Sequence, residues 1–425
     1  MIELVDLLQA TGGCTVGPVA ADRFTGFCYD SRQVAAGELF VALRTDWGDG
    51  HDYAAAACRG GARGVLCDRA VDVGSAAATV ILVEDTQAAL ADWARLVLRK
   101  QGVEVVGITG SAGKTTTKEA AAAVLGALQP VFRSPGNYSG RLGLPIALGG
   151  LQPGQKLAVL EMACDAPGEM GELVRLASPR HGVVLNVGAA HLETLGSLEN
   201  VAQEKGRLVE ALPADGWAVL NVDDPLVATM AARTAAQVLR IGFGPSADVR
   251  ASDVICREGG LSFRVQVGAE SALVRSRLLG RHNVYPLLAA LALGVAFGLR
   301  LTQAAASLEA LEPLPGRLRP LPGRRGSLLL DDSYSATPPA LQGALETLAS
   351  LGRRPRIAVL GDMAQLGSHE EAAHREAGRQ AAGAAEWLVT CGEHMRLAAE
   401  AAARHGMPRA HIRETYTAED AARAV

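Results

Sequence analysis

The sequence predicts an α/β protein of three domains in which helices cover mostly parallel β-sheets. Runs typical of strands alternate with runs typical of helices along most of the chain, and this alternation is characteristic of parallel sheets with helices on both faces. A glycine-rich turn at 107–117 joins one such strand to a helix. A chain of 425 residues is also too long for one hydrophobic core. We therefore expect domains at residues 1–100, 101–312 and 313–425.

Residues 1–100 are predicted to form a small α/β domain. Short runs rich in aliphatic, aromatic and β-branched residues predict four strands, at 24–29, 39–43, 64–67 and 79–83. Alanine-rich segments predict helices at 53–59 and 87–100.

The central domain is predicted to contain a P-loop-type parallel sheet. Its strands are expected at 103–109, 156–161, 182–187 and 217–221, with helices running to about residue 128, around 168–177 and near 198–211. A second βα series follows the proline-rich stretch at 313–322, with strands expected at 327–332, 356–360 and 386–391. This series predicts a doubly wound, Rossmann-like C-terminal domain.

The composition argues against several classes of protein. The formal net charge is −4, so no basic surface for nucleic acid is indicated. The N-terminus shows no basic segment followed by an apolar one, so no signal peptide is predicted. The longest uncharged apolar stretch, 284–299, is interrupted by Pro286 and is shorter than the roughly 20 residues that span a bilayer. We expect a buried helix there and no membrane span.

The seven cysteines are scattered without C-x-x-C spacing, which indicates neither a zinc site nor a disulfide framework. Reduced thiols are typical of cytoplasmic proteins, and we expect that location. Cys164 could be interpreted as a nucleophile, but the sequence places no base beside it, so a small buried residue is the simpler interpretation.

The glycine-rich turn predicts a phosphate-binding loop. It reads Gly-Ile-Thr-Gly-Ser-Ala-Gly-Lys-Thr-Thr-Thr and lies between an apolar run and a helix-forming run. In such a turn the backbone N–H groups and the helix N-terminus bind phosphate, Lys114 reaches the terminal phosphates and Thr115 can ligate Mg²⁺. A standard P-loop has a glycine where this chain has Ile108. We expect ATP to be held by seven consecutive residues, Gly110, Ser111, Ala112, Gly113, Lys114, Thr115 and Thr116.

Two further polar residues follow predicted strands of the central sheet. Glu161 ends the strand at 156–161, and His191 comes shortly after the strand at 182–187. Ligands of open α/β sheets bind at the carboxyl ends of strands. Glu161 is therefore a candidate Mg²⁺ ligand, and His191 could bind a metal or orient phosphate. An exposed strand-end carboxylate and a structural histidine are the alternatives.

A series of short motifs runs along nearly the whole length of the chain. They are Asp30-Ser31-Arg32, Gly37 to Leu43, Asp49-Gly50-His51-Asp52-Tyr53, the ATP loop, Gly143-Leu144-Pro145, Leu160-Glu161-Met162, Ala190-His191-Leu192-Glu193, Gly196-Ser197, Glu204-Lys205-Gly206, Asn221-Val222-Asp223-Asp224, Gly280-Arg281-His282-Asn283-Val284-Tyr285, Pro315-Gly316-Arg317-Leu318, Asp331-Asp332-Ser333-Tyr334, Gly361-Asp362-Met363 and His374-Arg375-Glu376. In these motifs the chain resembles the Mur ligase family, and within it the branch that adds D-alanyl-D-alanine.

This resemblance implies an ATP-dependent amide ligase of peptidoglycan synthesis that acts as a monomer. ATP would phosphorylate the carboxylate of a UDP-N-acetylmuramoyl-tripeptide, and the amine of D-alanyl-D-alanine would attack the acyl phosphate. Most of the catalysis would come from positioning and from the positive charge of Lys114 and Mg²⁺.

The resemblance also assigns roles to individual residues. Thr115 and Glu161 would hold one Mg²⁺ and His191 a second. Lys205 matches a lysine that is carbamylated in sibling ligases to supply a metal ligand, and a solvated helix lysine is the alternative. The remaining assignments are Asn283 to adenine, Arg317 and Asp332 to the phosphates and ribose, and Ser31, Arg32, Asp49, His51 and Asn137 to the UDP-linked substrate.

Several ligand-facing positions depart from the family pattern. Asn137 is the one asparagine kept of an expected three, the segment 161–169 lacks an asparagine and a histidine, and Ala112 replaces the usual asparagine of the ATP loop. The chain ends at Val425, before the last strand expected of the third domain. ATP chemistry is therefore expected, while the substrates stay open. The alternatives are a related ligase for a different carboxylate and amine, and a non-catalytic protein that binds nucleotide or a cell-wall precursor.

Overall fold

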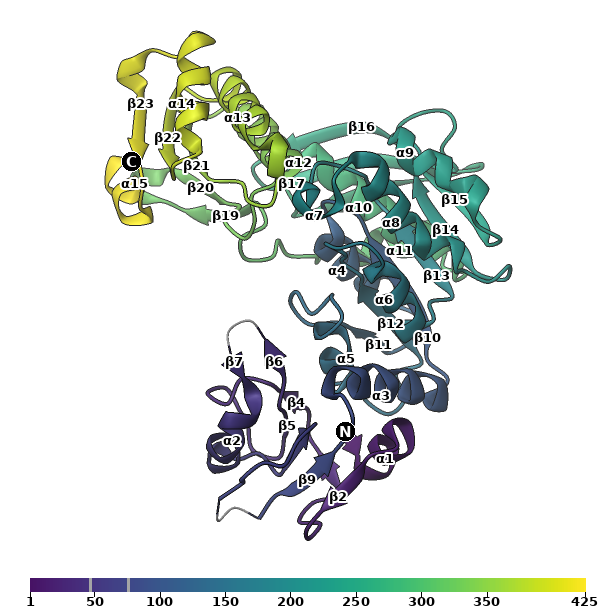
Figure 1. The fold of residues 1–425 in the computed structure, drawn as a ribbon. Coiled ribbons are helices and arrows are strands. Elements are labelled where there is room, and N and C mark those ends of the chain that lie inside the picture. The colour runs from purple at the N-terminus through teal and green to yellow at the C-terminus, as the bar shows by residue number, and fades with distance from the viewer. Residues whose placement is uncertain (46–47, 75–76) are drawn as a thin grey trace. The chain divides into compact units, whose positions relative to one another are not determined.

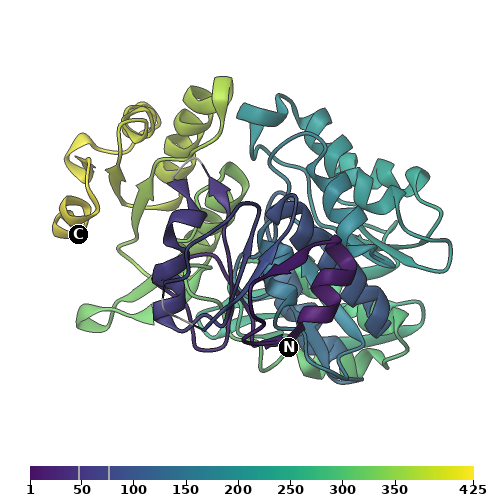
Figure 2. The ribbon, with the colours of Figure 1, turned by 60° about the horizontal axis from the view of Figure 1, so that its bottom comes forward.

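The computed structural model describes residues 1–45, 48–74 and 77–425, and it is drawn from two directions in Figures 1 and 2. By their internal contacts these residues group into two units. The first unit consists of 1–107, 129–163 and 169–180, and the second of 108–128, 164–168 and 181–425. Strands and helices alternate through both, as the sequence predicts for an α/β protein.

The N-terminal sheet has the strand order β2-β9-β8-β5-β4, in which β2 is antiparallel and the others are parallel. These strands are β2 (Cys14–Val16), β4 (Phe27–Cys28), β5 (Leu39–Val41), β8 (Gly64–Cys67) and β9 (Thr79–Leu82). Every side chain of β5 and β8 is buried, as expected for the centre of a sheet covered on both faces.

The strand predicted at 24–29 is divided in two. β3 (Arg23–Phe24) pairs with β1 (Ile2–Glu3), whereas β4 pairs with β5. The two pieces are separated by Thr25 and Gly26, and glycine favours such a break because it has no side chain to pack. A further short antiparallel pair consists of β6 (Arg44–Thr45) and β7 (Gly48–Asp49).

Three helices accompany this sheet, and the purple α1 packs against the blue α3 (Figure 2). Their bounds are α1 (Leu4–Thr11), α2 (Ala54–Gly60) and α3 (Thr86–Gln101). The Asp85 carboxylate accepts a hydrogen bond from the Ala88 backbone N–H at 2.8 Å and so caps α3. The Trp93 ring of α3 meets the Phe27 ring edge-on, with 4.7 Å between ring centroids.

The largest sheet has nine strands in the order β11-β12-β10-β13-β14-β15-β16-β17-β18. They are β10 (Glu104–Thr109), β11 (Val131–Arg133), β12 (Leu157–Glu161), β13 (His181–Val184), β14 (Trp217–Asn221), β15 (Gln237–Gly242), β16 (Val249–Arg257), β17 (Gly260–Val267) and β18 (Glu270–Ser276). Strands β13 to β16 pair in parallel, and β16 to β18 form an antiparallel meander. The sequence did not predict the meander, because its side chains alternate between buried and exposed and form no continuous apolar run.

Eight α-helices of the described chain lie between β10 and the C-terminal region: α4 (Lys114–Leu125), α5 (Gly143–Leu148), α6 (Glu169–Ala177), α7 (Leu192–Leu195), α8 (Leu198–Glu210), α9 (Pro225–Ala228), α10 (Val284–Ala296) and α11 (Leu301–Ser307). α10 is the buried helix predicted at 284–299, and it packs against α4. In the described part of the chain, no helix combines the length and apolarity needed to cross a membrane.

The three strands predicted in the C-terminal region are present, but they do not belong to one sheet. β20 (Leu328–Asp331) pairs antiparallel with β19 (Arg319–Pro322), while β21 (Ile357–Gly361), β22 (Trp387–Cys391) and β23 (Ile412–Thr415) form a parallel sheet. The helices are α12 (Pro338–Ser350), α13 (Glu370–Ala384), α14 (Met395–Arg404) and α15 (Ala418–Ala424). β21 lies at an edge of its sheet and exposes Ile357 and Val359.

The close packing of α10 gives a stability prediction. A Cβ added to Gly294 would lie 2.6 Å from Val124 Cγ1 and 3.2 Å from Ala304 Cβ. We expect Gly294→Ala to lower the free energy of unfolding by about 1–3 kcal/mol, because the neighbouring helices must separate. The matched control is Gly383→Ala on α13, where an added Cβ meets nothing within 4 Å. It should raise the free energy of unfolding by up to about 1 kcal/mol. Equal effects in urea titrations would contradict the close packing.

Candidate functional site

The predicted phosphate loop joins β10 to α4. Gly113 has φ 81° and caps the helix in the left-handed region, a conformation that glycine adopts without a Cβ clash. α4 begins at Lys114, whose Nζ donates a hydrogen bond to the Gly110 carbonyl at 3.0 Å. The loop therefore presents a helix N-terminus and a lysine at the end of a buried strand, which is the arrangement that binds anions.

Asn186, which sequence reasoning did not single out, clamps this loop. Its Oδ1 accepts a hydrogen bond from the Ala112 N–H at 2.8 Å, and its Nδ2 donates to the Ala112 carbonyl at 3.1 Å. Ser111 is held by the same segment, because its N–H donates to the Asn186 carbonyl at 3.1 Å and its hydroxyl accepts from the Gly188 N–H at 2.8 Å. The sequence signal that could have identified Asn186 is its position as an amide side chain shortly after the buried strand β13.

His191 lies immediately before α7, and its backbone has φ 57°. Its Nδ1 is hydrogen-bonded to Oε1 of Gln365 at 2.7 Å, and within the described chain its Nε2 has no hydrogen-bond partner. Burial lowers the pKa of His191 below its usual range, and the positive charges of Lys114 and Lys205 lower it further. These two charges act on the ring because the three side chains lie within electrostatic reach of one another.

Lys205 is buried on α8, with 2% of its surface exposed. Its Nζ contacts the Cys164 sulfur at 3.9 Å. The alternative of a solvated helix lysine is therefore wrong. A buried ammonium with so weak a partner is energetically unfavourable, so this position favours a chemical change or a bound anion.

Possible Mg²⁺ ligands occur in both units. In the second unit, the Thr115 hydroxyl makes no hydrogen bond to any described residue. In the first unit, Glu161 ends β12 and is 5% exposed, and its Oε2 is buried without a hydrogen-bond partner. Among the residues described, no three His, Cys, Asp or Glu side chains cluster as a metal site of their own. Mg²⁺ commonly takes one or two protein oxygens together with phosphates and water, so these donors suit it.

A narrow pocket in the second unit is lined by three of the predicted nucleotide residues, Thr116, Asn283 and Arg317. Its cavity of about 10 Å³ is lined by Thr116, Glu119, Leu278, Asn283, Leu311, Glu312, Leu314 and Arg317. Asn283 donates from Nδ2 to the Leu279 carbonyl at 2.6 Å, which orients its amide. The space holds about one water, so a nucleotide base would require it to widen.

Arg317 and Asp332 are both held by neighbours in the C-terminal region. The Arg317 guanidinium lies over the Tyr334 ring, 3.9 Å from its centroid. Asp332 accepts a hydrogen bond from the Leu318 N–H at 2.9 Å through Oδ1, and burial raises its pKa.

The motif at 280–285 mostly builds structure around Asn283. Arg281 lies over the Phe243 ring at 4.1 Å, and the Tyr285 hydroxyl donates to Asp223 Oδ2 at 3.1 Å. Burial raises the pKa of Tyr285. His282 is partly buried, and burial lowers its pKa to about 4.

Two of the predicted substrate residues, Asp49 and His51, are hydrogen-bonded to each other within the first unit. His51 is 4% exposed, and its Nδ1 lies 2.5 Å from Asp49 Oδ1. The Asp68 N–H donates to His51 Nε2 at 3.1 Å, so both ring nitrogens are occupied. Hydrogen bonding from the His51 backbone N–H lowers the pKa of Asp49, which also pairs with Arg69 at 3.2 Å.

The other three predicted substrate residues are accessible to solvent. Arg32 forms a two-point ion pair with Asp30 at 2.9 and 2.8 Å, and the hydrogen bond from Arg32 lowers the pKa of Asp30 to about 2. Asn137 is exposed and Ser31 is partly exposed. Their substrate-binding roles stay predictions.

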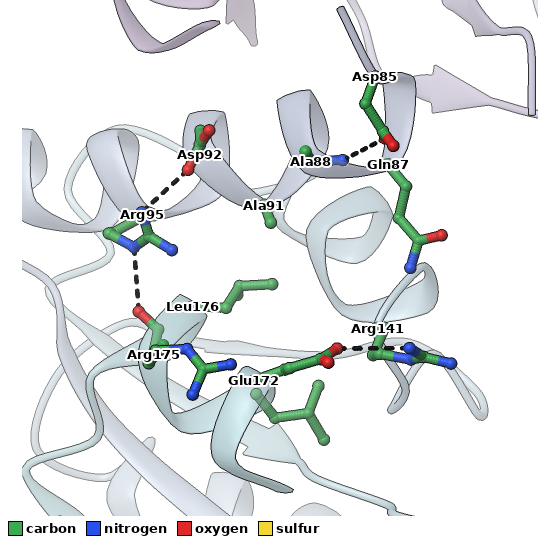
Figure 3. A pocket seen from close by; sticks show the side chains of 11 residues that line it. Asp85, Gln87, Ala88, Ala91, Asp92, Arg95, Arg141, Glu172, Arg175 and Leu176 are labelled. Carbon is green, nitrogen blue, oxygen red and sulfur yellow. Dashed lines mark hydrogen bonds and ion pairs between the residues drawn. The ribbon is translucent and has the colours of Figure 1, made fainter. Parts of the chain in front are cut away.

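A larger cavity in the first unit, of about 320 Å³, lies between α3 and α6 and contains none of the predicted site residues (Figure 3). Its charged side chains largely satisfy one another (Figure 3). Arg95 pairs with Asp92 at 2.9 Å, and Arg141 pairs with Glu172 at 3.5 Å. We therefore do not assign it as the active site.

The chain belongs to the Mur ligase family. Residues 23–98 match the catalytic domain of the Mur ligase family, 108–294 the Mur ligase middle domain, and 316–425 the glutamate ligase domain of Mur ligases. The predicted three-domain Mur ligase architecture is confirmed, while its boundaries near residues 100 and 312 stay predictions.

The relatives point to one branch of this family. The UDP-N-acetylmuramoyl-tripeptide–D-alanyl-D-alanine ligase of Bacillus subtilis is 36% identical over 354 residues, which are 83% of this chain and 76% of the relative. MurF from Acinetobacter baumannii superimposes with a TM-score of 0.87 at 26% identity, over 99% of this chain and 90% of that one. MurF from Thermotoga maritima, solved in complex with ADP, gives 0.78 at 26% identity over 96% of each chain. The resemblance to the branch that adds D-alanyl-D-alanine is thus confirmed.

The lowered pKa of His282 gives a pH prediction. Its pKa is about 4 in the folded chain and about 6.5 when unfolded. The unfolded chain therefore binds the proton more readily, so the stability contributed by neutral His282 is present above pH 6.5 and is lost as the pH falls toward 4. We expect His282→Gln to flatten the decline of unfolding free energy by up to about 1.4 kcal/mol per pH unit in that window. Parallel curves for both proteins in urea titrations would contradict this.

Proposed function

We propose that this chain is a MurF-type ligase, which uses ATP to join D-alanyl-D-alanine to a UDP-N-acetylmuramoyl-tripeptide. The observation that carries the proposal is the phosphate loop, clamped by Asn186 and ending in Lys114, in a chain 36% identical to a ligase of that name. We place the reaction in the cytoplasm and the chain as a monomer. No disulfide forms among the described cysteines, which suits a reducing compartment.

The phosphate loop would bind and orient ATP. The backbone N–H groups between Gly110 and Thr116 would bind phosphate oxygens, and the Lys114 ammonium would exchange the Gly110 carbonyl for the terminal phosphates. Transfer of the γ-phosphoryl group from ATP to the substrate carboxylate gives an acyl phosphate and ADP. The amine of D-alanyl-D-alanine then attacks the acyl carbon, and the amide forms with release of phosphate and a proton. Lys114 would stabilise the negative charge that develops on the transferred group.

Mg²⁺ would neutralise phosphate charge when bound. Thr115 and Glu161 would hold one ion, because the first offers an unbonded hydroxyl and the second a buried oxygen without a partner. His191 would be a ligand of a second ion through Nε2. Lys205 would complete that site as a carbamate, formed when its neutral amine adds to CO₂ and loses a proton, and this would replace a buried ammonium by an anion beside the metal.

The remaining residues would position the substrates. Asn283 would contact the adenine from its pocket, and Arg317 and Asp332 would reach the phosphates and ribose as that pocket widens. The UDP-linked substrate would be contacted by Ser31, Arg32 and Asn137. Asp49 and His51 would support this binding indirectly, because their hydrogen bonds hold the surrounding loop in place.

Phosphate release measured with UDP-N-acetylmuramoyl-tripeptide and D-alanyl-D-alanine tests the proposal directly. The wild-type chain should release phosphate only when both substrates are present. Lys114→Ala should lower the rate by about 100-fold or more, because one charge-stabilising group is lost. The control is Lys156→Ala, an exposed lysine outside the site, which should keep the wild-type rate. Full activity in the Lys114 variant, or release only with other carboxylates and amines, would overturn the assignment.

The Lys205 carbamate has its own test. Lys205→Ala should be inactive, and added acetate or propionate should restore part of the rate by supplying the missing carboxylate. The control is Lys118→Ala, which removes another fully buried lysine and should not respond to these acids. No recovery in the Lys205 variant would contradict the carbamate and favour a plain buried ammonium.

A further inference from the structure

The hydrogen bond between His191 and Gln365 joins two parts of the second unit that are far apart in the sequence. The partners are separated by 174 positions, and His191 lies in the middle-domain match whereas Gln365 lies in the C-terminal match. An amide oxygen can only accept, so the bond from Nδ1 to Oε1 at 2.7 Å requires the proton on Nδ1. The Nε2 lone pair is then free to bind a ligand.

The backbone on both sides of this bond is held in place. His191 and Gln365 have φ values of 57° and 62°, which few residues other than glycine adopt. Gln365 lies between Met363 and Leu366, which are 2% and 1% exposed and anchor its segment in the C-terminal core. Such strained conformations persist only where the surroundings fix them, and they concentrate at functional sites.

The two segments also meet through their main chains. The Glu193 N–H donates to the Gln365 carbonyl at 3.3 Å. Gly367 approaches so closely that a Cβ on it would lie 3.1 Å from Glu193 Cα. The side-chain bond is therefore part of a packed contact.

We propose that Gln365 is a positioning residue that fixes the Nδ1–H tautomer and the ring orientation of His191, so that Nε2 faces the metal and phosphate side of the site. This inference rests on the proposed function, since it assigns His191 the role of ligand. Histidine ligands commonly donate their other N–H to a fixed acceptor, which sets the tautomer and raises ligand affinity. Because the acceptor comes from the C-terminal segment, His191 becomes oriented only when that segment contacts α7.

Three substitutions separate this role from simple support of the loop. Gln365→Met keeps the length and removes the acceptor. Gln365→Asn keeps an amide and tolerates positive φ well, but it shortens the reach by one methylene. Gln365→Glu keeps an acceptor at the same distance. The matched control is Gln342→Met on α12, where the amide bonds to Glu346 in the next turn.

The first measurement is a long-range ¹H–¹⁵N spectrum of the histidine-labelled protein without nucleotide or metal, in which the His191 signals are assigned by their absence from His191→Gln. We expect the Nδ1–H tautomer in wild type, Gln365→Glu and Gln342→Met, and a loss of that preference in Gln365→Met and Gln365→Asn. An unchanged tautomer in the last two variants would overturn the inference.

The second measurement is Mn²⁺ binding in the presence of ADP, followed by electron paramagnetic resonance. We expect about tenfold weaker binding in Gln365→Met and Gln365→Asn, because loss of such an outer partner typically weakens metal affinity about 10- to 100-fold. Gln365→Glu should stay close to wild type. Tautomer loss in a protein that shows no ligase turnover would keep the inference and reject the proposed function. Ligase turnover with an unchanged tautomer and unchanged Mn²⁺ affinity would do the reverse.

Discussion

The paired hydrogen bonds between Asn186 and the backbone of Ala112 are the interaction on which the rest of the site depends. A loop that contains glycines at 107, 110 and 113 has little conformational preference of its own. The Asn186 amide, carried by the segment that follows β13, fixes this loop at one residue through both its N–H and its carbonyl. The donors that would receive phosphate are therefore oriented before any ligand arrives, which is the condition for strong electrostatic stabilisation.

The segment that follows β13 also contacts the C-terminal part of the second unit. Gly188 holds the Ser111 hydroxyl on one side, and on the other a Cβ at Gly188 would lie 2.8 Å from Pro339 Cγ. Three residues further on, His191 meets Gln365. Residues 186–193 thus contact both the phosphate loop and the C-terminal segment, so a movement of that segment would change the environment of the loop and of His191 together. The C-terminal segment and the phosphate loop can therefore be coupled directly through residues 186–193, without a long chain of intermediate contacts.

The features that could be predicted from the sequence are those that depend on a local pattern of residues. Continuous apolar runs marked the buried strands and α10, and glycine spacing marked the loop. Sequence reasoning missed the antiparallel meander at 249–276, where alternate side chains face outward, and the break at Gly26. It could not find Asn186 or Gln365, because their partners lie 74 and 174 positions away and only the fold brings them together. The ring of His51 is buried and both of its nitrogens are hydrogen-bonded within the first unit, so its assignment to the UDP-linked substrate stays a prediction.

The departures from the family pattern fall into two physical kinds. Ala112 replaces an asparagine, yet both of its bonds to Asn186 run through the backbone, so the loop geometry does not need that side chain. Cys164 is different, since it is 2% exposed and contacts the Lys205 ammonium. The side chain at position 164 therefore determines which group lies beside this buried positive charge. Exposed Asn137 has no such internal role in the described chain. Variation at backbone-bonded and exposed positions therefore leaves the phosphate site intact, whereas variation at position 164 changes the immediate environment of Lys205 and with it the chemistry open to that lysine.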